Sequence, residues 1–209
     1  MKKRILCFGD SNTWGYIPGN AGRYDENTRW TCLLERKLGD SYDVVEEGMT
    51  GRTTVFDTGF DDYQNGKKAL GFVLKSQIPL DAAVIMLGTN DICDHHMSRI
   101  ELGLGEIVRI VKNANTIFRL KTPVFPHGAK ILLISPLPFG KACGLPGDMI
   151  EESRLFPGMT RRVAENTGVS FLDPSPFITP SDTDGIHFTA ESHGVLADLV
   201  HKALVEMNI

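Results

Sequence analysis

The stretch ILCFGDSNTWGY, Ile5–Tyr16, carries an apolar run directly into a glycine, an aspartate and a serine. A nearly continuous apolar run of this length is typical of a strand that is buried on both faces of a sheet. Similar short runs recur, and we expect strands at Arg4–Phe8, Asp43–Val45, Ala82–Leu87, Lys130–Ser135 and Val169–Leu172. Ser11 therefore stands just beyond the carboxyl end of the first strand.

Segments with helical spacing separate these runs. Apolar residues from Ile100 to Val111 recur at positions i, i+4, i+7, i+8 and i+11, which places them on one helix face. Strands that alternate with helices predict right-handed βαβ crossovers and a parallel sheet covered on both sides. We expect fold class α/β: a single doubly wound domain over residues 1–209, with three α/β/α layers and five strands.

The last helix is expected to begin after Thr189, which is available as its N-cap. Its apolar face runs from Leu196 to Met207, and His193 and His201 are expected on its outer face.

Two stretches between the expected elements are typical of loops. Pro136–Pro157 is rich in proline and glycine and predicts one long loop, and Lys121–Ala129 predicts a shorter one. Loops of that length serve as lids, pocket walls or subunit contacts, or are plain surface excursions.

Composition narrows the class of protein. A hydrophobic content of 42% and a charged content of 23% in 209 residues are ordinary for a globular domain. The net charge of −4 leaves no basic excess to neutralise a row of phosphates, so nucleic acid is not an expected partner. The first apolar run stops after Phe8, which is too short for a signal-peptide core or a membrane span.

The four cysteines have no close ligand spacing and are expected to be free thiols in a reducing compartment: Cys7, Cys32, Cys93 and Cys143. We therefore expect a cytoplasmic protein.

Polar, glycine-bearing stretches follow four of the expected strands, at Gly9–Asn12, Gly48–Arg52, Gly88–Asp91 and Asp184–His187. In open parallel α/β sheets, ligands bind outside the carboxyl ends of the strands, so these stretches converge on one edge. A serine hydroxyl needs a base to take its proton, and His187 is available for Ser11. Asp184, three residues before His187, can hold the other ring nitrogen. The residues predict a catalytic triad of Ser11, His187 and Asp184.

Attack by Ser11 on a carbonyl carbon would place negative charge on the carbonyl oxygen. The backbone N–H groups of Ser11 and Gly51 and the side-chain amide of Asn90 are candidate donors to that oxygen. Each residue also has a structural interpretation: Ser11 as a helix cap, Gly51 as a turn glycine and Asn90 as a loop residue bonding its own turn. For Gly48 we expect a turn glycine with positive φ.

The residues beside these stretches complete the predicted site. Asn12 and Trp14 are predicted to contact substrate, although a packing role for Trp14 is also open. Asp91 is expected to brace its own loop. Asp91, Asp94, His95 and His96 crowd together, but adjacent histidines do not easily meet one ion, and we expect neither a metal nor another cofactor.

In order and spacing, Gly9-Asp10-Ser11, Gly48-x-x-Gly51, Gly88-Thr89-Asn90-Asp91 and Asp184-x-x-His187 resemble the four blocks of SGNH hydrolases, also called the GDSL esterase/lipase family. The resemblance spans Lys3 to about Leu204 and is closest to the small bacterial arylesterase and acyltransferase branch. It implies a flavodoxin-like fold and hydrolysis of short-chain acyl or aryl esters without a metal. It also implies that Ser11, Gly51 and Asn90 form the oxyanion hole. Both homo-oligomers and acyl transfer to alcohols occur in that branch.

The chain departs from the family at Asn12, where leucine or isoleucine is usual, and at Glu46-Glu47, where many members have an asparagine. The alternative function is a flavodoxin-like protein that binds a phosphate or nucleotide cofactor at the helix after Ser11. This alternative leaves Asp184 and His187 without a role. An α/β-hydrolase is discounted because Ser11 lacks the G-x-S-x-G elbow.

Overall fold

The computed structural model describes residues 2–59 and 62–209. Its strands are β1 (Lys3–Gly9), β2 (Tyr42–Gly48), β3 (Ala82–Met86), β4 (Lys130–Ile134) and β5 (Ser170–Leu172). Its helices are α1 (Ser11–Trp14), α2 (Trp30–Leu38), α3 (Gly66–Ser76), α4 (Met97–Lys112), α5 (Ala114–Phe118), α6 (Gly147–Ser153), α7 (Phe156–Thr167) and α8 (Ala190–Glu206). Short 3-10 turns lie at η1 (Asp62–Gln64), η2 (Asp91–Cys93) and η3 (Lys141–Cys143).

The five strands form one parallel sheet in the order β2-β1-β3-β4-β5. Each lies where its apolar run predicts it, and the α/β class is confirmed. Strand β1, next to the edge strand β2, pairs with β2 on one side and with the central strand β3 on the other; Ile5, for example, lies opposite both Val44 and Ala82. The chain passes from β1 to one neighbour and then returns across it to the other. This reversal is a topological switch point, where open α/β sheets bind their ligands.

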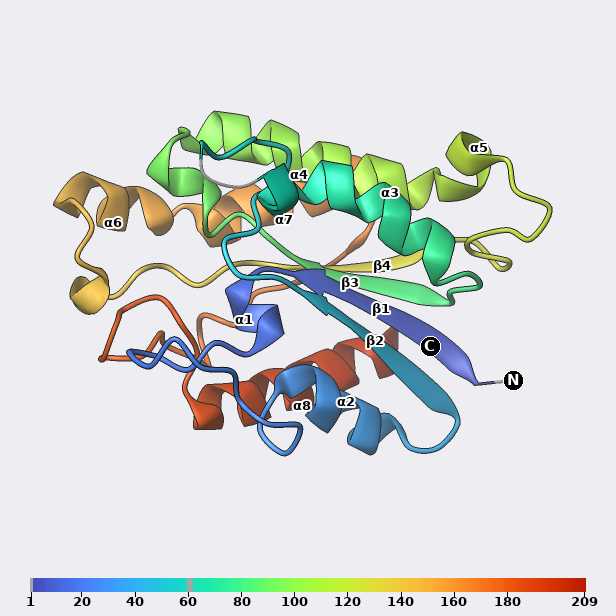
Figure 1. Cartoon of the computed structure of the whole chain (residues 1–209), viewed down its shortest axis with the longest axis horizontal. Coiled ribbons are helices and arrows are strands. Elements are labelled where there is room, and N and C mark those ends of the chain that lie inside the picture. The colour runs from blue at the N-terminus through green and yellow to red at the C-terminus, as the bar shows by residue number, and fades with distance from the viewer. Residues whose placement is uncertain (1, 60–61) are drawn as a thin grey trace.

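Helices cover both faces of the sheet (Figure 1). Helices α3, α4 and α7 lie on one face, and α2 and α8 lie on the other. Successive residues of β1 point to opposite faces: Leu6 and Phe8 join the core under the first group, and Ile5 and Cys7 join the core under the second. Because helices bury both faces of the central strands, a ligand can reach the sheet only at the ends of the strands.

The prediction that His193 lies on the outer face of the last helix is wrong. Thr189 does cap α8 by accepting the Ser192 N–H, but His193 is completely buried. Its Nδ1 accepts the backbone N–H of Trp30, the first residue of α2, at 3.3 Å. His193 lies three residues before Leu196, so it belongs to the inward face of the helix.

The region Pro136–Pro157, predicted as one long loop, contains η3, the helix α6 and the start of α7. A buried serine ties it down: the Ser153 hydroxyl accepts the Phe139 N–H at 2.8 Å and donates to the carbonyl of Ile150 at 2.6 Å. A short helix anchored by these contacts has too few turns to show a periodic apolar pattern. The predicted loop at Lys121–Ala129 is confirmed.

The prediction that Gly48 is a turn glycine with positive φ is also wrong, because its φ is not positive. Gly48 is needed for close approach instead: a Cβ there would lie 2.1 Å from the backbone nitrogen of Trp14. Helix α1 therefore packs directly on the end of β2.

Candidate active site

Ser11 opens helix α1 two positions beyond the end of β1. Asp10, and not Ser11, is the N-cap of this helix: its carboxylate accepts the Asn12 N–H at 2.9 Å. Burial raises the pKa of Asp10, although the bond from Asn12 opposes that shift. The Ser11 hydroxyl therefore does not cap the helix, and it lies at the carboxyl edge of the sheet.

The loop before α8 brings two polar side chains to Ser11. His187 Nε2 lies 3.0 Å from Ser11 Oγ, and His187 Nδ1 lies 2.8 Å from Asp184 Oδ2. A carboxylate only accepts, so the Nδ1 proton points at Asp184 and Nε2 is free to accept the Ser11 proton. The structure therefore joins the three predicted triad residues in one line of hydrogen bonds.

Asp184 is held by more than the imidazole. Its Oδ1 accepts the backbone N–H groups of Ile186 at 3.1 Å and His187 at 3.0 Å. Burial alone would raise the pKa of Asp184, but these bonds, together with the imidazole, outweigh it and hold the pKa below its usual value. The carboxylate therefore stays ionised beside His187.

The second and third polar stretches are tied to each other beside Ser11. Asn90 Nδ2 donates to the carbonyl of Arg52 at 2.9 Å, which uses one of its two hydrogens. Gly51, next to Arg52, has φ of +72°, a conformation that turns its peptide in a way side chains rarely allow. Ser11 N–H belongs to the first turn of α1, whose amides have no acceptor within the helix. These are the three donors that the sequence predicts for an oxyanion.

Asp91 was expected to brace its own loop, but its side chain instead ties that loop to Thr54, 37 positions away and just after the second polar stretch. Its Oδ1 accepts both the N–H and the hydroxyl of Thr54, at 2.9 and 2.5 Å. Burial raises the pKa of Asp91 to about 6, against the effect of the Thr54 bonds.

Arg52 is a structural residue to which the sequence assigned no role. It is 4% exposed, donates to the carbonyls of Gly9 (2.9 Å) and Glu47, and places its guanidinium over the Phe8 ring at 4.2 Å. Burial lowers its pKa to about 10. Arg52 thus links the ends of β1 and β2 to the Gly51 turn. An arginine immediately after a glycine turn was the only signal for it.

Aromatic side chains wall one side of the site. The Tyr16 ring stacks on the His187 imidazole, with centroids 4.1 Å apart and planes 25° apart. Trp14 lies beyond it, 6.4 Å from Tyr16, and the Arg23 guanidinium covers the indole at 5.3 Å. Tyr16, which the sequence offers together with Trp14 as a wall of the acyl or alcohol pocket, therefore contacts His187 directly.

Residues 7–195 match the sequence model of the GDSL-like Lipase/Acylhydrolase family. The chain belongs to this family. As a GDSL hydrolase it is a carboxylic ester hydrolase that acts on a small-molecule ester, and the alternative of a phosphate-binding protein is not favoured.

Solved structures of similar length resemble this GDSL hydrolase throughout. The carbohydrate acetylesterase Est24 from Sinorhizobium meliloti is 32% identical, with a TM-score of 0.91 over 99% of this chain and 100% of that one. An aryl esterase from M. smegmatis is 31% identical, with a TM-score of 0.89 over 98% and 99%. A putative arylesterase from Agrobacterium tumefaciens is 30% identical, with a TM-score of 0.87 over 98% and 99%. No curated protein sequence matches the chain.

The structure gives the Asn12 side chain two partners that the sequence did not predict. Asn12 is 5% exposed, and its side-chain amide bonds the backbone of Ile186 and Phe188, on either side of His187. The amide of this residue is therefore engaged within the GDSL hydrolase itself.

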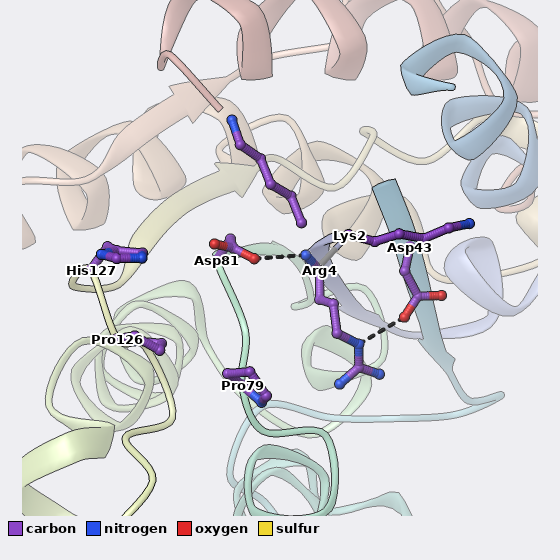
Figure 2. A pocket seen from close by; sticks show the side chains of 8 residues that line it. Lys2, Arg4, Asp43, Pro79, Asp81, Pro126 and His127 are labelled. Atoms are coloured by element: carbon purple, nitrogen blue, oxygen red, sulfur yellow. Dashed lines mark hydrogen bonds and ion pairs between the residues drawn. The ribbon is translucent and has the colours of Figure 1, made fainter. Parts of the chain in front are cut away.

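A cavity of about 470 Å³ lies at the opposite edge of the sheet (Figure 2). Lys2, Arg4 and His127 line it, together with Asp81 and Asp43, which holds Arg4 Nε at 2.7 Å. It opens at the amino ends of the strands, so it is separate from the triad.

Within residues 2–59 and 62–209, no group of three or more His, Cys, Asp or Glu side chains is arranged to hold a metal. In that same part of the chain, every helix is too short or too polar to cross a membrane.

Proposed function

We propose that this GDSL hydrolase is a serine esterase that cleaves short-chain acyl or aryl esters through an acyl-enzyme. The hydrogen-bonded line Ser11–His187–Asp184 carries the proposal. In the first step, Ser11 Oγ bonds to the ester carbonyl carbon while its proton passes to His187 Nε2. The bond to the leaving oxygen then breaks, and His187 returns the proton to the departing alcohol.

Water completes the cycle. It attacks the acyl group on Ser11, His187 Nε2 takes a proton from it, and the bond to Ser11 Oγ breaks as the serine regains its proton. The net reaction turns an ester and water into a carboxylic acid and an alcohol. In both steps the N–H groups of Ser11 and Gly51 and the amide of Asn90 would stabilise the negative carbonyl oxygen, each donor being worth about 10²–10³ in kcat.

Two observations favour small acyl groups. A similar enzyme of known structure, 32% identical over nearly the whole chain, is a carbohydrate acetylesterase, and acetyl is a small acyl group; the aryl esterase, 31% identical, supports instead an aryl alcohol side of the ester. Ser11 is only 4% exposed, so access to the nucleophile is narrow. An alcohol that reached the acyl-enzyme in place of water would give acyl transfer instead of hydrolysis.

The proposal also covers location, domain organisation and assembly. We place the enzyme in the cytoplasm, as one catalytic domain whose site combines residues from both ends of the chain. Its mass in solution would show whether it forms homo-oligomers. Support for a reducing compartment comes from the four cysteines, all free, of which Cys7 is fully buried with its pKa raised by that burial.

The test compares the wild type with Ser11→Ala on p-nitrophenyl acetate, butyrate and octanoate, followed by intact mass after a fluorophosphonate. We expect the wild type to hydrolyse the acetate fastest and to gain one adduct, and Ser11→Ala to lose both properties. Ser76→Ala, on the outer surface of α3, is the matched control and should keep both. Hydrolysis or labelling that survives in Ser11→Ala would refute the proposed nucleophile.

A further inference from the structure

The side-chain amide of Asn12 holds the peptide groups on both sides of His187. Its Oδ1 accepts the Phe188 N–H at 3.0 Å, and its Nδ2 donates to the Ile186 carbonyl at a longer 3.4 Å. These are the two backbone groups that a residue of a neighbouring parallel strand would engage around His187. Asn12 therefore acts on the His187 segment as a short piece of sheet would.

This contact lies directly beside the reacting pair. Asn12 follows Ser11 in α1, so two consecutive residues of one short helix meet three consecutive residues of one loop. Ser11 meets the side chain of His187 at 3.0 Å, and Asn12 meets the backbone around it. The first contact is the one that transfers the proton, and the second sets where the imidazole stands.

The protein shields the two hydrogen bonds of Asn12 from water. Asn12 is 5% exposed and Phe188 only 1%, and the Phe188 ring meets the His193 ring edge-on at 5.6 Å. Hydrogen bonds in such surroundings are strong, and a buried N–H that loses its acceptor is costly because water cannot replace the partner. The leucine or isoleucine usual at this position in the family has no polar group to make either bond.

We propose that Asn12 is a positioning residue, which acts through the backbone of Ile186 and Phe188 to keep His187 Nε2 within reach of Ser11 Oγ. The inference rests on the proposed role of His187 as the base. It differs from a substrate-binding role for Asn12, because a positioning residue changes kcat by a similar factor for every ester, whereas a substrate contact changes KM according to the acyl group.

The main variant is Asn12→Leu, which keeps the approximate size of the side chain and removes both bonds. We expect kcat to fall about 10–100-fold, since misplacement of a reacting group by roughly 1 Å costs about that much. KM should stay within about twofold for both p-nitrophenyl acetate and butyrate. Fluorophosphonate labelling should slow in parallel with kcat, and the downfield proton signal of His187 Nδ1–H should shift or broaden.

The matched control is Asn115→Leu. Asn115 makes the same pair of bonds to a backbone segment, donating to the Phe125 carbonyl at 2.8 Å and accepting the Phe125 N–H at 2.9 Å. It lies in α5, far from α1 in Figure 1. Its loss should change the melting temperature but leave kcat and the Nδ1–H signal as in the wild type.

Asn12→Asp is the second variant, which tests the proposal if Asn12→Leu does not fold. A carboxylate keeps the acceptor for Phe188 N–H and loses only the donor to Ile186, so we expect a smaller loss of kcat, about 2–10-fold.

The outcomes separate the two proposals. Should Asn12→Leu, or Asn12→Asp if the leucine variant is unfolded, keep the wild-type kcat and Nδ1–H signal, the positioning role is refuted. A KM that rises selectively for one acyl group would refute it in favour of substrate contact. Hydrolysis by Ser11→Ala would instead remove the proposed function on which the inference stands.

Discussion

The buried histidine of α8 predicts a specific loss of stability in acid. His193 is completely buried among the Tyr24 and Phe188 rings, whose centroids lie 5.3 and 5.6 Å away. Burial, and in second place the charge of Arg29, lowers its pKa from 6.5 to about 4. The perturbation we choose is His193→Gln, which removes the titration and keeps an oxygen to accept the Trp30 N–H.

The magnitude follows from linkage. Between the unfolded and folded pKa values the unfolded chain binds a proton that the folded chain does not, so stability falls as the pH falls. A pKa lowered from 6.5 to about 4 corresponds to about 3 kcal/mol, at roughly 1.4 kcal/mol per unit. This stability is fully present above about pH 6.5 and is lost as the pH falls towards about pH 4.

The assay is urea unfolding of the wild type and His193→Gln at a series of values from about pH 7 to about pH 4. We expect the free energy of unfolding of the wild type to fall, relative to the variant, by about 3 kcal/mol across this range. His201→Gln, on the same helix but partly exposed, is the control and should run parallel to the wild type. If the wild type and His193→Gln also run parallel, His193 is not buried in its neutral form.

Three further substitutions probe the site and its brace. Asp184→Asn should lower kcat for p-nitrophenyl acetate by up to about 10⁴, as loss of the imidazole's orienting carboxylate does in serine proteases; a rate within tenfold of the wild type would remove Asp184 from the triad. Asn90→Ala should lower kcat about 10²–10³-fold with little change in KM, and a change confined to KM would contradict its oxyanion role. The Asp91 pKa, raised to about 6, means that the folded state holds its proton more tightly and that wild-type stability falls as the pH rises from about 4 to about 6. The free energy of unfolding of Asp91→Asn should therefore gain about 2 kcal/mol on the wild type over that range, and a constant difference in urea unfolding would contradict the raised pKa.

The strands and the meeting of the four polar stretches were predictable because each depends on local pattern. An apolar run such as Ile5–Phe8 specifies a buried strand, and parallel strands bring their carboxyl ends to one edge whatever the rest of the fold does. The contacts of Ser11, His187 and Asp184 follow from that edge. Their distances do not, since they depend on how the loop before α8 is held.

The sequence did not show contacts between residues that lie far apart along the chain. The substrate contact predicted for Asn12 stays a prediction, but the bonds of its amide to Ile186 and Phe188, 174 and 176 positions away, could not be read from local pattern. His193 was placed outside although it shares a helix face with Leu196, Ala197 and Val200, all buried. A histidine in phase with an apolar helix face is a signal, present in the sequence, that it lies on the inward side.

Ser11 and His187, the proposed nucleophile and its base, form a hydrogen bond across 176 positions of the chain. A ribosome adding roughly 5–20 residues per second would need roughly 10 to 35 seconds between the nucleophile and its base. During that time Ser11, at the start of α1, follows a strand that can pair with β2 and then with β3 as each is made, yet the base proposed to take its proton has not been synthesised. Until the loop before α8 has been made and has docked, the growing chain is an inert scaffold, and the cell meets the esterase only as a finished molecule.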